Sequence, residues 1–166
     1  MSPNPHARTH LSRRTMIILR VNEQAEDFYE KSKELGTRAA RSFDTQGRER
    51  EKHRSQMTGL ENIAETTLKA TDVLDYIKKQ MARERSGWTI PEQQFGEHLK
   101  RYIEDKDGLK VAVDAVCTSV GIGDTTEEDR RERKHVRLLL IRQLIRQVVV
   151  QFEYEDSELE KRRNTR

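Results

Sequence analysis

Apolar and small residues between positions 60 and 81 recur at alternating spacings of three and four, which is a seven-residue repeat. Such a repeat places one stripe of side chains along one side of an α-helix. Its members are Leu60, Ile63, Thr67, Ala70, Leu74, Ile77 and Met81. The pattern predicts a single long helix over residues 54–85. The residues expected to widen its buried surface are Ala64, Leu68, Val73 and Tyr76.

A first helix is predicted over residues 22–42, because Asn22 can serve as its N-cap and apolar residues follow at helical spacing. Residues 16–21 precede it as a short extended segment or a first helical turn. The polar stretch at 44–56 is interpreted either as a break in the chain or as the solvated start of the long helix.

A third helical region is predicted to start at Thr89, because Thr89, Pro91 and Glu92 fit a capping-box start. It continues, with one interruption, to residue 120 and ends at a glycine-containing turn. Trp88 is expected to pack against the junction that precedes this region.

The last helix is predicted over residues 126–152, and apolar side chains cover more than half of its circumference. It is therefore expected to be the most buried element. Its start is assigned to Thr125 with Glu128 or to Asp124 with Glu127. Residues 148–154 also alternate like a β-strand, although the helical interpretation is preferred.

These elements predict an all-α fold, a bundle of four to five helices with long amphipathic helices and flexible charged termini. The scarcity of glycine (8) and proline (3) favours long elements over the many turns of a β-sandwich. A single helical domain is assigned to residues 16–154. A flexible basic extension at 1–15 precedes it, and a charged, frayed tail at 155–166 follows it.

Charge is abundant but balanced in the body of the chain. Charged residues make up 37% of the sequence, against about 25% in an ordinary globular domain. The net charge is +3, and the first 20 residues carry four arginines and no acid, so the remainder is close to neutral. One cysteine and no long apolar run predict a cytoplasmic protein without a membrane segment.

Residues suited to catalysis or metal binding do not form a recognisable set. Cys117 lies among valines at helical spacing and is expected to be a buried core residue. Glu132 and His135 have the Glu-x-x-His spacing of di-metal helix bundles, but a second such motif is missing. The glycines around Ile122 lack the lysine of a phosphate loop. No catalytic residue, metal, cofactor or small-molecule substrate is inferred, and a non-enzymatic protein is expected.

Three basic clusters are candidates for contact with a polyanion. The first lies at residues 48–54, the second spans 78–85, and the third spans 130–137. On one continuous helix the first two would lie ~45 Å apart. The second and third could converge if their helices pack together. The candidate nucleic-acid-binding residues are Lys78, Lys79, Arg83, Arg130, Arg131, Arg133 and Arg137.

Two apolar residues of the last helix, Leu139 and Val150, fall on its polar side. Exposed apolar side chains of this kind often mark a protein interface. The main expectation is therefore an interaction module that acts as a homo-oligomer or as a subunit of a larger complex. The alternative is sequence-independent binding to a nucleic-acid backbone, since few aromatic residues are available for base stacking.

In size, helical character and scattered basic patches, the chain loosely resembles the small helical subunits of RNA-guided CRISPR effector complexes. The resemblance rests on architecture and not on a motif. It implies backbone contacts along a nucleic-acid groove, and it bears on the alternative function only.

Overall fold

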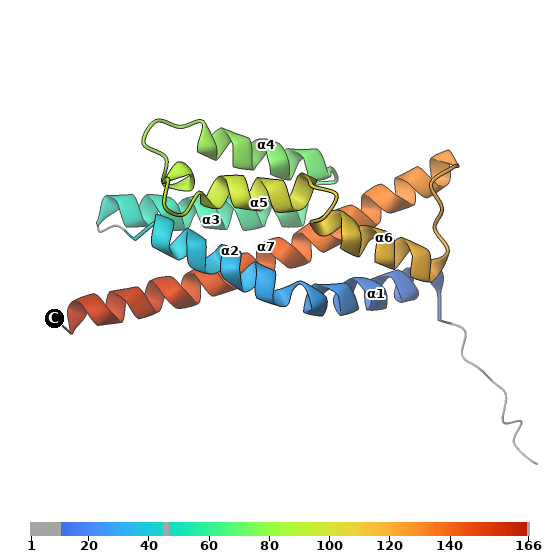
Figure 1. The fold of residues 1–166 in the computed structure, drawn as a ribbon, viewed down its shortest axis with the longest axis horizontal. Coiled ribbons are helices and arrows are strands. Elements are labelled where there is room, and N and C mark those ends of the chain that lie inside the picture. The colour runs from blue at the N-terminus through green and yellow to red at the C-terminus, as the bar shows by residue number, and fades with distance from the viewer. Residues whose placement is uncertain (1–10, 45–46, 166) are drawn as a thin grey trace, which may run out of the picture.

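The computed structural model describes residues 11–44 and 47–165, and within them every regular element is helical. The helices are α1 (Arg13–Asp27), α2 (Tyr29–Ser42), α3 (Arg48–Thr66), α4 (Ala70–Met81), the short 3₁₀ turn η1 (Gly87–Thr89), α5 (Phe95–Glu104), α6 (Leu109–Val120) and α7 (Glu127–Asn164). Figure 1 shows α7 running along the whole length of the molecule. The predicted all-α class is confirmed, although the predicted four to five helices are too few.

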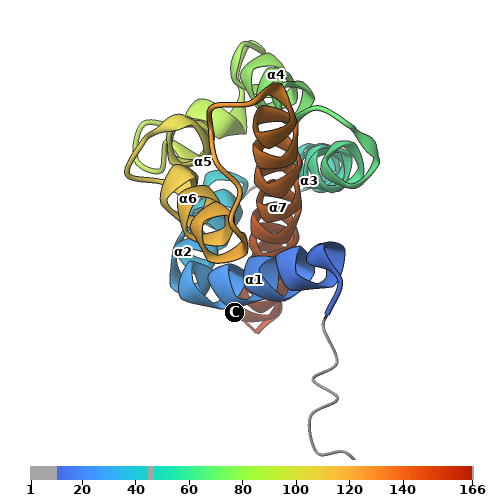
Figure 2. The same cartoon turned by 90° about the vertical axis from the view of Figure 1, so that its right-hand side faces the viewer.

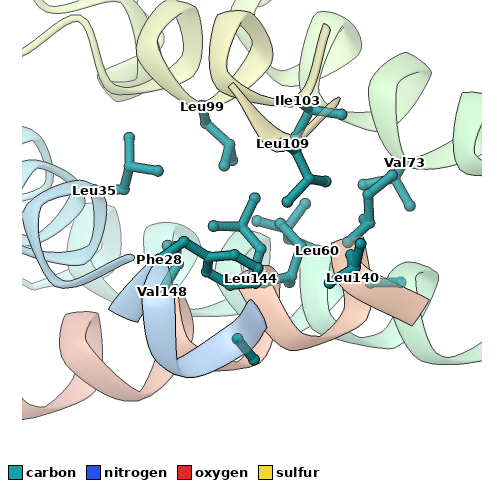
Figure 3. Packing of buried hydrophobic residues seen from close by; sticks show 14 of the residues in the cluster. Phe28, Leu35, Leu60, Val73, Leu99, Ile103, Leu109, Leu140, Leu144 and Val148 are labelled. Carbon is teal, nitrogen blue, oxygen red and sulfur yellow. The ribbon is translucent and has the colours of Figure 1, made fainter. Parts of the chain in front are cut away.

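Helix α7 lies at the centre and contacts most of the other helices. Viewed from its first residues, α3 lies on one side of it, α5 and α6 lie on the other, and α1 crosses it (Figure 2). Leu140, Leu144 and Val148 of α7 point into a core supplied by the surrounding helices (Figure 3). All three are fully buried, so the prediction that this helix is highly buried is confirmed.

The ends of α7 differ from the prediction at both termini. Its capping box is formed by Thr126 and Asp129, whose side chains exchange hydrogen bonds with each other's backbone N–H groups, and not by either predicted pair. Residues 148–154 are helical, as preferred from the sequence. Residues 155–164 are not a frayed tail but the last turns of the same helix.

An ion-pair cluster explains why the end of α7 is ordered. Asp156 is only 5% exposed, and its carboxylate accepts hydrogen bonds from Arg50 and Arg54 of α3. Arg50 also donates to Glu160. These bonds raise the pKa of the Arg50 guanidinium above its ordinary value. The bond to Glu160 contributes most to this rise, and the bond to Asp156 contributes the next largest part. The apparent charged tail is therefore packed against α3.

The predicted long helix over 54–85 is wrong, because the chain folds back at residues 67–69 into an α3–α4 hairpin. The Tyr76 hydroxyl of α4 donates to the Gln56 carbonyl of α3, 20 residues earlier in the chain. Thr67 adopts an extended conformation, and its side chain accepts a hydrogen bond from the Lys69 N–H. Leu68, expected to be buried, is 88% exposed in this joint.

The first predicted helix and the start of the third region also change. Helix α1 begins at Arg13, so part of the predicted extension is helical, and α1 and α2 meet at Phe28. Residues 1–10 of that extension lie outside the described residues. Thr89 ends η1, and α5 begins only at Phe95, so the predicted capping box is wrong. Trp88, expected to pack against this junction, is fully buried.

None of the described helices combines the length and apolar character required to cross a bilayer.

Candidate binding surfaces

The predicted basic residues of α4 and α7 do not form one patch. Met81, at the end of α4, lies against Gly96 at the start of α5, whereas Arg137 of α7 donates to the Ile103 carbonyl at the end of α5. Lys79 and Arg83 therefore lie towards the start of α5, whereas the α7 cations lie towards its end. Only Lys78 reaches across, through a 3.8 Å ion pair with Glu104.

Four cations of α7 share one side of the helix, because they follow each other at spacings of three, one and three. They are Arg130, Arg133, Lys134 and Arg137, and we call them the cationic face. Arg131, also a predicted nucleic-acid contact, lies off this face and pairs with Glu127, with both side chains more than three-quarters exposed. The structure thus separates Arg131 from the other predicted α7 residues.

The cationic face borders a cleft of about 270 Å³ between α5, α6 and α7. Its apolar lining comes from Ile103 and Val113, and its charged lining comes from Glu104, Lys110, Asp114, Arg133, Lys134 and Arg137. Four cations and two carboxylates therefore surround the cleft. We call this site the α5–α6–α7 cleft.

One carboxylate fixes two of the four cations. Asp114 accepts hydrogen bonds from Lys110 and from Arg133, each at 2.6 Å. Among the described residues, the one hydrogen bond of the Arg137 side chain is a long bond of 3.4 Å to the Ile103 carbonyl. Within the part of the chain that the structure describes, neither Lys134 nor Arg137 has an ion-pair partner. The cleft therefore carries uncompensated positive charge.

A second surface lies on nearly the opposite side of α7. Leu139 follows Arg137 by two residues, which is roughly 200° around a helix. Arg146 and Val150 follow Leu139 at helical spacing on the same side. This side is bordered by α3 through the Arg146–Glu65 ion pair and by α1 through the Gln143–Asn22 hydrogen bond.

The two predicted interface residues lie on this surface but differ in exposure. Leu139 is partly buried and lines a groove of about 210 Å³ together with Ile18 of α1. Val150 is 59% exposed, and Tyr154, one turn later, is 62% exposed. We call the surface formed by Ile18, Leu139, Arg146, Val150 and Tyr154 the open face.

The side chains considered for catalysis or metal binding do not converge on a reactive site among the described residues. Burial raises the pKa of the Cys117 thiol, and Cys117 lies in the core as predicted. Glu132 pairs with Arg13 of α1 at 2.7 Å, and His135 is exposed. Across residues 11–44 and 47–165, no group of three or more His, Cys, Asp or Glu side chains is arranged to hold a metal ion.

Sequence reasoning missed several residues of both surfaces. Lys110 and Asp114 are an i, i+4 ion pair on α6, and that spacing was visible in the sequence. Nothing in the sequence placed them opposite Arg133. Ile18 lies on the open face because α1 packs beside Leu139. Tyr154 lies on it because α7 continues beyond the predicted end of the helix.

No protein-family model matches the chain, and neither a curated protein nor a solved structure matches it.

Proposed function

We propose that this protein is a helical-bundle interaction module, cytoplasmic and non-enzymatic, that binds a protein partner through the open face. The observation that supports the proposal is the pair Val150 and Tyr154, both more than half exposed on the most central helix of the fold. Apolar side chains on an otherwise polar surface are favoured where a partner removes them from water.

The partner is either a second copy of this chain or another protein of a larger assembly. In both cases a charged residue at position 150 would be buried without a counter-ion, which opposes binding. Val111 of α6 provides a matched control, because it is 56% exposed on a different helix and surface.

Light scattering over a concentration series tests the homo-oligomer. If the wild type associates, Val150→Glu should shift it towards the monomer and Val111→Glu should leave it unchanged. For a different partner, a photo-crosslinking residue placed at 150 in cells should give a specific adduct that the same residue at 111 does not give. A monomeric wild type with the same adducts from both positions would contradict the proposal.

A second candidate is sequence-independent binding to a nucleic-acid backbone, as in the resemblance to small CRISPR effector subunits. The observation that favours it is the cationic face, in which Arg130, Lys134 and Arg137 have no ion-pair partner among the described residues. Backbone binding depends steeply on salt, since each neutralised phosphate releases counter-ions. A salt titration of binding to random single-stranded and duplex oligonucleotides tests this function. An absence of binding at low salt would contradict it.

A further inference from the structure

We propose that the α5–α6–α7 cleft is a phosphate-binding site. The inference goes beyond the interaction module, because the cleft and the open face lie on nearly opposite sides of α7 and can be tested separately. It deepens the second candidate, because a nucleic-acid backbone is one source of the phosphate, whereas a small phosphate ester is the other.

The first argument is the charge that the cleft leaves uncompensated. Asp114 is shared between Lys110 and Arg133, and Glu104 is paired with Lys78 from outside the cleft. Lys134 and Arg137 then remain without a carboxylate in the described part of the chain. A phosphate monoester carries a charge of about −1.5 to −2 and three acceptor oxygens, which suits a site with two or more free cations better than a single carboxylate does. A nucleic-acid backbone carries one negative charge on each phosphodiester, so successive phosphates would supply the charge along the same cations.

The second argument is the geometry of the donors. Arg133 is held in place by its bond to Asp114, and its side chain is 26% exposed, so it is oriented and still reachable. Arg137 uses one N–H on the Ile103 carbonyl and keeps its remaining N–H groups for a ligand. A planar guanidinium can bind two phosphate oxygens at once, and it gives stronger hydrogen bonds than a neutral donor.

The third argument is the shape of the site. The volume of about 270 Å³ accommodates a phosphate with part of the group that carries it, while Ile103 and Val113 offer an apolar wall for that group. Arg130 continues the cationic face one turn beyond the cleft, so an extended polyanion would meet a further cation along α7.

The test is calorimetric titration of the full chain at low salt with pyrophosphate, with a short random single-stranded oligonucleotide, and with acetate. Pyrophosphate binding would identify a small phosphate compound as a source, and binding of the oligonucleotide alone would identify a nucleic-acid backbone. Acetate should bind more weakly than either. If neither phosphate probe binds, the proposal is overturned, whatever the result for the open face.

Variants locate the binding. Lys134→Gln with Arg137→Gln should weaken the binding of the effective probe by about tenfold or more, as expected for loss of two charged donors. Lys134→Gln alone, at an exposed position, should give a smaller loss in the same direction. Arg131→Gln removes one cation of the same helix turn away from the cleft and should change the affinity less than about twofold. If Arg131→Gln weakened binding as much as Lys134→Gln does, the probe would be held by diffuse charge attraction and the proposed site would be overturned.

Discussion

Helix α7 and the α3–α4 hairpin both come from segments that the sequence assigns to one continuous helix each, yet only α7 is continuous. Helix α7 has neighbours on several sides, so its apolar residues are buried around much of its circumference. The hairpin has its apolar stripe divided between two helices that pack against each other. Periodicity therefore predicted which side chains would be buried better than it predicted whether the backbone between them would remain helical.

Local chemistry explains the break at residues 67–69. Arg142 of α7 donates at 2.9 Å to the Ala64 and Thr67 carbonyls, which satisfies acceptors at the end of α3. The Thr67 hydroxyl accepts from the Lys69 N–H and also hydrogen-bonds with the Asp72 carboxylate in the first turn of α4. These bonds satisfy several of the backbone groups at the end of α3, so the helix ends at Thr66 without a glycine or proline there.

The largest expected effect comes from the core of α7. Leu144→Ala removes a fully buried side chain and should lower the free energy of unfolding by about 3–5 kcal/mol. Urea denaturation followed by circular dichroism measures the change. Val150→Ala, on the exposed side of the same helix, should cost less than about 1 kcal/mol. Equal costs at the two positions would contradict the central placement of α7.

The next effect concerns the contact between the end of α7 and α3. Asp156→Asn preserves the shape of the side chain but leaves Arg50 and Arg54 without its charge, and we expect a loss of about 1–3 kcal/mol. Glu158→Gln is the control, because Glu158 pairs with Lys161 at the surface and should change the unfolding free energy much less than Asp156→Asn does. If both variants match the wild type in urea denaturation, the end of α7 is the frayed tail that the sequence suggested.

A pH dependence should come from α3. His53 is 5% exposed and stacks on Phe43 at 4.4 Å, and burial lowers the pKa of its ring. The charge of Glu49 opposes this shift to a smaller extent, and the charge of Lys52 adds to it. The folded state therefore disfavours the proton that the unfolded chain accepts. The contribution of His53 to stability is fully present above its ordinary pKa of 6.5 and declines as the pH falls below it.

The decline should be at most about 1.4 kcal/mol per pH unit. His53→Gln should remove this part of the slope of unfolding free energy against pH, whereas the exposed His135→Gln should retain it. An unchanged slope in His53→Gln would show that the ring titrates alike in the folded and unfolded states.

The smallest expected effect lies in the joint of the hairpin. Leu68 is 88% exposed, so Leu68→Gln should change the unfolding free energy by less than about 0.5 kcal/mol. A buried leucine in a continuous helix would instead cost several kcal/mol on replacement by a polar residue. Thermal or urea unfolding of this variant therefore distinguishes the hairpin from the long helix.

The sequence predicted the all-α class, the core position of Cys117 and the helical character of residues 148–154, because each depends on local periodicity. The order of the end of α7 could not be predicted, since it depends on Arg50 and Arg54 more than 100 residues earlier. The cleft is hidden for the same reason, because Asp114 meets Arg133 only after α6 packs on α7.

The most direct test of the fold-back compares two spin-label distances in a Cys117→Ala background. Labels at Ser55 and Lys79 would be ~36 Å apart along one continuous helix. The hairpin predicts less than half of that distance, because Tyr76 hydrogen-bonds to Gln56. Labels at Arg130 and Arg162 should be ~48 Å apart along α7. A long Ser55–Lys79 distance would contradict the hairpin, and a short Arg130–Arg162 distance would contradict the continuous central helix.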